Sequence, residues 1–212
     1  MKDLFKDLFK GCWTIPNLLS FLRIIMVPIF AVLFYKGEFL WAVFVLFLSG
    51  LSDTLDGKIA RRFNQVSALG KILDPIADKI TQITIAVMLF LEFNKAQSSA
   101  LRAFSWVFLV FLVKEALMIL GGAVMLACGI RPGAAEIYGK IATLAFYTIM
   151  FVIMLAGPEI GALVQLGLIE NGIPEVATMV LVVISAVLTI VAFISYLPAT
   201  FRQFKERGEQ KK

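Results

Sequence analysis

The chain has 212 residues, of which 60% are hydrophobic, and a mean hydropathy of +0.89. Average soluble domains contain about 45–50% apolar residues, so this composition excludes an ordinary soluble protein and predicts an all-α membrane protein. The sequence carries 20 Lys and Arg against 15 Asp and Glu but no histidine, which excludes Ser-His-Asp and Cys-His catalysis and zinc sites with imidazole ligands.

The first thirteen residues contain a tandem repeat of four residues, KDLFKDLFK. On a helix this repeat places its lysines in one row and its Leu and Phe side chains in neighbouring rows. The pattern predicts a short amphipathic helix, residues 1–13, that lies on an anionic membrane surface. A terminal tail without a role fits the pattern equally well.

Six apolar segments follow and predict a polytopic membrane protein with six transmembrane helices, which form one domain over residues 1–212. An even number of spans places both termini on the same side of the membrane. Only Lys36, Lys95 and Arg102 fall on the opposite side, so the positive-inside rule predicts cytoplasmic termini in a cell membrane. The predicted spans are residues 15–35, 39–51, 75–93, 103–127, 141–155 and 177–197, with a polar loop over 94–102.

Polar residues interrupt two of these spans. Asn17, Ser20 and Arg23 are spaced by three and therefore form one stripe on the first span. An intramembrane arginine is by default a functional residue. The fourth span carries Lys114 and Glu115, which either line a catalytic cavity or neutralise other buried charges.

The densest polar segment is residues 52–79, which lies between two apolar runs and contains four aspartates. Four lipid-facing carboxylates would cost roughly 10 kcal/mol, so they are expected to face water, a cation or one another. Asp53 and Asp56 share a helix face, as do Asp74 and Asp78 if a helix begins near Pro75. Such hard oxygen ligands select Mg²⁺, Mn²⁺ or Ca²⁺, and four of them can hold two ions about 4 Å apart for a phosphoryl displacement.

The spacing within this segment resembles the signature of the CDP-alcohol phosphotransferases, D-x-x-D-G-x-x-A-R, eight residues, G-x-x-x-D-x-x-x-D. The resemblance implies that an alcohol displaces CMP from a CDP-linked group. It also implies a metal cofactor, two ions of Mg²⁺ or Mn²⁺. In a membrane, it implies CDP-diacylglycerol as the donor, and a homodimer; no nucleic-acid partner is expected. The implied roles are metal ligation by Asp53, Asp56, Asp74 and Asp78, proton abstraction by Asp78, and donor contacts by Gly57, Ala60, Arg61 and Gly70.

The acceptor alcohol is less clearly specified. The run TIPNLLSFLRIIMVPIF is similar to bacterial phosphatidylglycerophosphate synthases, whose acceptor is glycerol 3-phosphate, although eukaryotic-type cardiolipin synthases share much of it. The first group typically has Gly-Lys-x-Lys-Thr at the fifth span, often with a later Gln, whereas this chain has Gly-Lys-Ile-Ala-Thr over 139–143 and no such Gln. The expected phosphate-binding cations are Arg23, Lys114, Arg131 and Lys140. The alternatives are phosphatidylglycerol, serine or an inositol compound as acceptor and, in a different class, a cation-dependent transporter.

Overall fold

The computed structural model describes residues 14–62, 70–128 and 137–210, and within these ranges it leaves out the side chains of residues 56–62, 71–72 and 204–210. The described residues are helical and contain no strand, as the composition predicts. The predicted N-terminal helix lies outside them. The elements are α2 (Ile15–Tyr35), α3 (Phe39–Arg62), α4 (Gly70–Lys95), α5 (Ser99–Phe104), the 3-10 turn η1 (Ser105–Val107), α6 (Phe108–Ala127), α7 (Ile137–Ala156), α8 (Ala162–Gln165) and α9 (Glu175–Gln210).

The ends of α2 follow directly from its sequence. Thr14 caps the first turn, because its hydroxyl accepts a hydrogen bond from the Asn17 N–H at 3.4 Å. At the other end Gly37 has a φ of 79°, and its N–H bonds the carbonyl of Phe34. The N–H of Glu38 reaches the Leu33 carbonyl, which completes a Schellman motif and turns the chain sharply into α3.

Two predicted boundaries are wrong. We expected a helix to begin near Pro75 with Asp74 close to its cap, but α4 begins at Gly70 and both residues lie inside it. Pro75 lies past the first turn of α4 and has no N–H to donate to the carbonyl of residue 71, so it removes one hydrogen bond from the start of this helix. The predicted polar loop over 94–102 is also interrupted, because the Ser98 side chain caps a new helix, α5.

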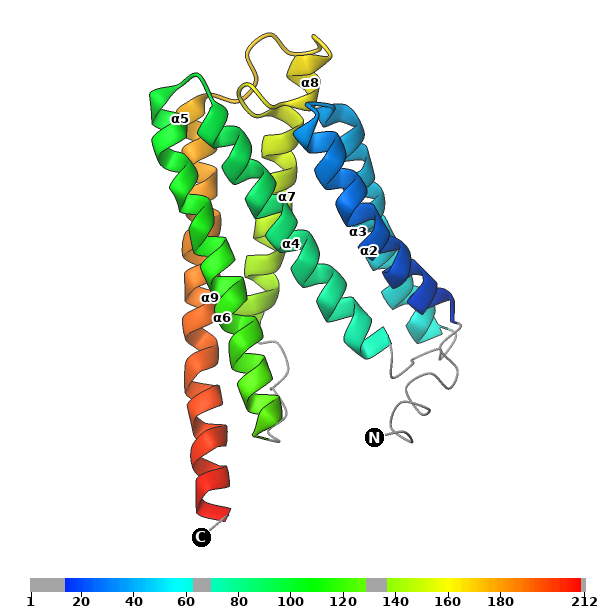
Figure 1. Ribbon diagram of the computed structural model, residues 1–212, viewed down its shortest axis with the longest axis vertical. Helices are drawn as coiled ribbons and strands as arrows, with labels where there is room; N and C mark the ends of the chain where they lie inside the picture. The colour runs from blue at the N-terminus through cyan, green and yellow to red at the C-terminus, as the bar shows by residue number, and fades with distance from the viewer. Residues whose placement is uncertain (1–13, 63–69, 129–136, 211–212) are drawn as a thin grey trace.

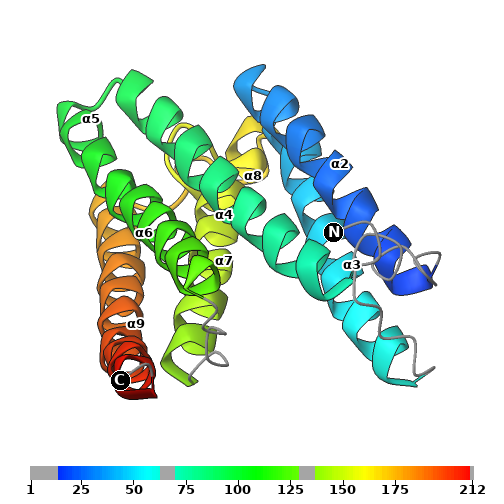
Figure 2. The ribbon, with the colours of Figure 1, turned by 60° about the horizontal axis from the view of Figure 1, so that its bottom comes forward.

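Six long helices of the described chain run alternately up and down, so the start of α2 and the end of α9 lie at the same end (Figure 1). The helix α2 packs along both α3 and α4, and α4 in turn contacts α6. The helices α7 and α9 pack together, with α6 against α9. Figure 2 shows the same order from another side, with α4 between the α2–α3 pair and the group formed by α6, α7 and α9.

The described surface is apolar where a soluble protein would be polar. On α2, Leu18 and Phe21 are exposed, whereas Asn17, Ser20 and Arg23 are buried. This distribution is typical of a helix that faces lipid on one side and a polar interior on the other. By length and composition, four segments of the described chain could cross a membrane, and α3 is apolar over a shorter stretch, Phe39–Leu55; six spans therefore remain a prediction. The four segments are Ile15–Tyr35, Ser99–Ala127, Ile137–Ala156 and Glu175–Gln203.

An aromatic and aliphatic core fills the inside of the bundle and extends up to the aspartate region. Phe30 and Phe34 of α2 are almost fully buried there, and Phe108, Phe111 and Phe146 form a chain of ring contacts from α6 to α7. The centroids of Phe111 and Phe146 are 5.0 Å apart. The aspartates lie nearer the end where α2 begins, because Ser20 and Arg23 of α2 bond Asp74 and Asp53.

Candidate active site

The polar stripe of α2 holds carboxylates from two other helices. The Ser20 hydroxyl donates a hydrogen bond of 2.5 Å to Asp74 on α4. Arg23 forms an ion pair with Asp53 on α3, with Nη1 2.6 Å from Oδ1. The stripe predicted from the spacing of three therefore bonds Asp53 and Asp74 of two other helices, which explains why polar side chains are tolerated in this apolar helix.

The Arg23–Asp53 pair is asymmetric in its exposure. The Arg23 side chain is 4% exposed, whereas that of Asp53 is 62% exposed. A buried guanidinium needs a counter-ion, and removing one partner of such a pair leaves an uncompensated charge. Asp53 thus neutralises Arg23 from one side while its carboxylate remains accessible from an open cavity.

This cavity, of about 580 Å³, lies among α2, α3, α4 and α7. Arg23, Asp53 and Asp78 line its polar end together with Thr81 and Tyr147. Its remaining lining is largely apolar, and several of these side chains, such as Phe47 and Leu144, are also exposed on the outside of the bundle. The volume lies within the usual range of ligand pockets, and the division into a charged end and an apolar side suits an amphiphilic ligand. The apolar side is formed by Leu46, Phe47, Leu51, Leu144, Phe151 and Val152.

Two neutral donors hold the carboxylate of Asp78. The hydroxyl of Tyr147 on α7 donates to Oδ1 at 2.7 Å, and the amide of Gln82 donates to Oδ2 at 2.9 Å. Asp53 is close enough to Asp78 and Asp74 for their negative charges to repel one another. The described aspartates of the motif are therefore gathered around one region, where a cation would lower their mutual repulsion.

Beside this region, Glu115 of α6 lies between two lysines. Its Oε2 is 2.6 Å from Nζ of Lys79, and its Oε1 bonds the neighbouring Lys114. Glu115 is only 3% exposed, so the pairing with Lys79 also ties α6 to α4. Two cations and one carboxylate leave a formal charge of +1 in this group of three, which we call the Glu115 cluster. Of the two roles expected for Lys114 and Glu115, neutralisation is thus observed within the cluster.

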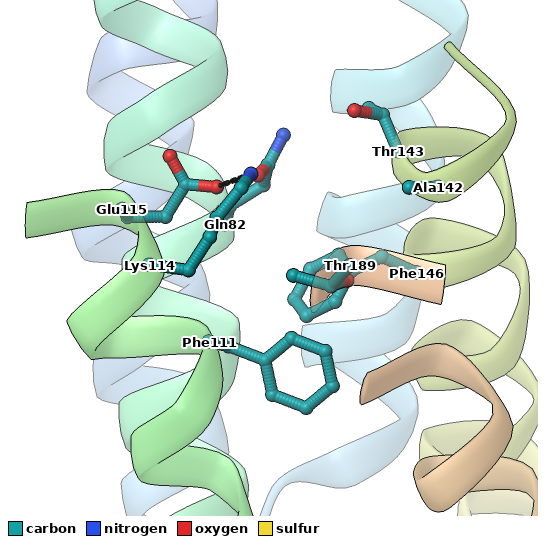
Figure 3. Close-up of a pocket in the computed structure, with 8 residues that line it drawn as sticks. All are labelled: Gln82, Phe111, Lys114, Glu115, Ala142, Thr143, Phe146 and Thr189. Carbon is teal, nitrogen blue, oxygen red and sulfur yellow. Dashed lines mark hydrogen bonds and ion pairs between the residues drawn. The ribbon is translucent and has the colours of Figure 1, made fainter. Parts of the chain in front are cut away.

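A small second cavity adjoins the Glu115 cluster (Figure 3). Gln82, Lys114 and Glu115 face Ala142 and Thr143 of α7 across it, and Phe111, Phe146 and Thr189 complete its lining. Its volume of about 10 Å³ has room for about one water molecule. Since Gln82 also bonds Asp78, the side chain of Gln82 connects this cavity to the aspartates.

The remaining predicted site residues are described unequally. Asp56, Gly57, Ala60 and Arg61 lie on α3, but their side chains are not described, and Arg131 lies outside the described residues. Gly70 is the first residue of α4 and is buried. Lys140 is exposed near the start of α7. The donor contacts at residues 57–61 therefore stay a prediction.

The donor atoms suit a hard divalent cation. Asp53, Asp74 and Asp78 offer carboxylate oxygens, with no thiolate among the cavity-lining side chains. Within the part of the chain that the structure describes, no three carboxylates are close enough together to hold one ion unaided. Asp56, the fourth predicted ligand, is among the side chains left out of the description. By donor type, the observed residues fit Mg²⁺ or Mn²⁺.

Sequence reasoning missed three residues that the structure places at the site: Lys79, Gln82 and Tyr147. Gln82 is four positions after Asp78, and this helical spacing could have identified it as a same-face partner. Lys79 was visible as a charge within the motif, but nothing in the sequence pairs it with Glu115. Tyr147 lies 69 positions from Asp78, and its sequence context is apolar.

The comparison with protein families gives the same answer as the motif. The model of the CDP-alcohol phosphatidyltransferase family matches residues 13–193, which include every described site residue. The chain belongs to this family. It is therefore a phosphatidyltransferase of phospholipid biosynthesis, which leaves the transporter alternative without support. Members of the family are embedded in membranes and use a CDP-alcohol donor and an alcohol acceptor.

Individual relatives of this CDP-alcohol phosphatidyltransferase carry two different names. A cardiolipin synthase (CMP-forming) from Streptomyces coelicolor is 38% identical over 136 residues, which span 61% of this chain and 60% of that protein. A CDP-diacylglycerol–glycerol-3-phosphate 3-phosphatidyltransferase from Aquifex aeolicus is 29% identical over 91% of this chain and 99% of its own length. The human cardiolipin synthase (CMP-forming) is 51% identical, but over only 35% of this chain and 25% of its own length. The relatives therefore agree on the family and differ in the acceptor.

Proposed function

We propose that this enzyme transfers a phosphatidyl group from CDP-diacylglycerol to sn-glycerol 3-phosphate and releases CMP. The donor assignment is supported by the 580 Å³ cavity, whose charged end would take the diphosphate and whose apolar side would take the acyl chains. Arg23 was expected to bind the acceptor phosphate, but it lines this cavity, so we assign its guanidinium to the donor phosphate oxygens instead. The positions of Asp53 and Asp78 at the same end support their role at the reacting phosphorus.

The proposed reaction is a displacement at the phosphorus that carries diacylglycerol. The acceptor hydroxyl oxygen forms the new P–O bond, the P–O bond to CMP breaks, and the hydroxyl proton passes to Asp78. Mg²⁺ or Mn²⁺, two ions in our proposal, held by Asp53, Asp56, Asp74 and Asp78, would polarise the diphosphate and stabilise the CMP leaving group. Asp78 is assigned as the base because it lines the cavity and its carboxylate is oriented there by the neutral donors Gln82 and Tyr147.

The observation that carries the acceptor assignment is the Glu115 cluster. Its net charge of +1 lies beside the small cavity that Gln82 connects to Asp78, so a phosphate bound there would complete the charge balance. A neutral acceptor such as inositol would not need this surplus charge. Lys140 is exposed near the start of α7, two residues before Ala142 of the small cavity, and is available as a further cation. The cavity has room for one water only, so the proposal requires it to widen when the acceptor binds.

An acceptor screen with the purified enzyme tests the proposal. Radiolabelled CDP-diacylglycerol would be supplied with glycerol 3-phosphate, phosphatidylglycerol, serine, inositol or inositol phosphate, and the labelled lipid and CMP would be measured. We expect phosphatidylglycerophosphate with glycerol 3-phosphate, and no product from the Asp78→Asn variant as the matched control. Turnover with phosphatidylglycerol or serine but not with glycerol 3-phosphate would refute the acceptor assignment.

Phosphatidylglycerol is the second candidate, and a specific groove favours it. This groove, of about 330 Å³, lies between α6 and α9 and is lined by apolar side chains and by Lys114, which also lines the small cavity. An acyl chain of a phospholipid acceptor could occupy the groove with its phosphate at Lys114. Val113→Trp should fill the groove and reduce turnover with phosphatidylglycerol while leaving turnover with glycerol 3-phosphate unchanged.

The location of the enzyme also forms part of the proposal. Both termini and the active site would face the cytoplasm of a cell membrane, because most of the Lys and Arg residues lie at that end of the predicted spans. This orientation gives the site access to soluble glycerol phosphate and nucleotides. We further propose a homodimer, on the resemblance to the family.

A further inference from the structure

The hydrogen bonds around Asp78 fix its carboxylate from two sides. The Tyr147 hydroxyl lies 2.7 Å from Oδ1 and 3.2 Å from the Asp78 backbone carbonyl, so the carboxylate is its nearer acceptor. The Gln82 amide bonds the other oxygen, Oδ2, at 2.9 Å. Each oxygen of Asp78 thus accepts one hydrogen bond from an uncharged donor, and the two donors stand on different helices.

The surroundings show that these donors have little freedom to move. Gln82 is buried, with 5% exposure, and lines the small cavity beside the Glu115 cluster. Tyr147 is half-buried and lines the larger cavity together with Asp53. The ring of Phe146 contacts the Tyr147 ring in an edge-on arrangement, with centroids 5.7 Å apart. The Asp78 carboxylate is therefore clamped between a donor facing the larger cavity and a donor facing the smaller one.

We propose that Tyr147 and Gln82 are positioning residues, which set the rotation of the Asp78 carboxylate so that its remaining lone pairs face the acceptor hydroxyl and the metal site. This inference rests on the proposed role of Asp78. A carboxylate offers about four lone-pair directions and can rotate widely about its terminal torsion. Two hydrogen bonds, one to each oxygen, restrict this rotation to one orientation. Errors of about 1 Å in a reacting group can cost about 100-fold in rate, so such a clamp matters for turnover.

Tyr147→Phe is the sharpest variant, because it removes the hydroxyl and keeps the ring that packs on Phe146. We expect kcat to fall by about 10–100-fold, with the KM for CDP-diacylglycerol changed by less than about twofold. Gln82→Leu, which removes the amide at similar volume, should behave in the same way. Tyr35→Phe is the matched control, because Tyr35 is the last residue of α2, far from Asp78, and its ring contacts the Lys95 ammonium. This variant should leave kcat and the KM for CDP-diacylglycerol unchanged.

A second measurement does not depend on turnover. Mn²⁺ binding to the purified protein without substrate, followed by electron paramagnetic resonance, should weaken severalfold in Tyr147→Phe and in Gln82→Leu but not in Tyr35→Phe. A merely structural role would lower thermal stability and leave the Mn²⁺ affinity and the split between kcat and KM unaltered. Wild-type kcat and wild-type Mn²⁺ affinity in both variants would overturn the inference.

The same experiments separate this inference from the proposed function. If Asp78→Asn itself leaves Mn²⁺ binding and turnover intact, the role of Asp78 fails, and the positioning role fails with it. If Asp78→Asn abolishes both, while Tyr147→Phe and Gln82→Leu match the wild type, only the positioning role fails. If the wild-type enzyme uses another acceptor, the assignment of glycerol 3-phosphate is refuted. The positioning role of Tyr147 and Gln82 is still supported if both variants lower kcat with that acceptor.

Discussion

Replacing Glu115 by glutamine removes one negative charge from between two lysines and changes little else. Lys79 lies 2.6 Å from the lost charge, and Lys114 bonds the other oxygen of the same carboxylate. Breaking a fully buried ion pair costs about 3–5 kcal/mol. The side chains of Lys79 and Lys114 are 27% and 14% exposed, so water relieves part of the repulsion, and we expect a loss of about 2–4 kcal/mol.

For a chain of this length, that loss corresponds to a fall of about 4–16 °C in the melting temperature, measured by thermal unfolding in detergent. The control is Glu92→Gln, which makes the same chemical change in the pair of Glu92 with Lys95, whose side chain is 53% exposed. Such exposed pairs contribute about 0–1 kcal/mol, so the control should melt close to the wild type. If Glu115→Gln is no less stable than Glu92→Gln, the reasoning about a buried cluster is refuted.

Four further predictions address the metal, the acceptor, the topology and the packing of α7. Activity should require Mg²⁺ or Mn²⁺, and Asp53→Asn should abolish CMP release; full activity in excess chelator would contradict this. Lys140→Ala should raise the KM for glycerol 3-phosphate and leave the KM for the donor nearly unchanged, and an equal rise in both would argue against an acceptor contact. A cysteine introduced at Lys36 should be labelled only from outside the cell, and cytoplasmic labelling would reverse the proposed orientation. Gly139→Ala should destabilise the protein, because the new Cβ would overlap the Tyr196 hydroxyl, and adding Tyr196→Ala should recover part of the loss.

The sequence predicts the helices well because their physical causes are local. Long apolar runs bounded by Thr14 and Gly37 specify α2 without any knowledge of its neighbours. The start of α4 was misplaced because proline favours the first helical position, whereas Pro75 lies inside this helix. The other misjudged segment is residues 94–102, which was predicted to be a loop. Ser98 caps α5 there, but a serine in a short polar segment is equally typical of a loop.

The site was predictable only in part. Helical spacing identified the stripe of α2 and the pairs of aspartates, because residues three and four apart share a face. It could not identify their partners, since Ser20 bonds Asp74 at a separation of 54 positions. The separation of Tyr147 from Asp78 is 69 positions, and a tyrosine in an apolar helix gives no signal that distinguishes a clamp from a packing residue.

The stripe of α2 has a consequence for how the protein enters a membrane. During synthesis Arg23 emerges before Asp53, its partner in the next helix, so α2 would have to enter lipid with an unpaired guanidinium. Insertion experiments place that cost at about 2.5–3.5 kcal/mol for a central position. If α2 and α3 leave the translocon together as a helical hairpin, which the sharp turn at Gly37 permits, the pair forms before the guanidinium meets the hydrocarbon. The contact that prepares the active site would then also guide the biogenesis of the protein.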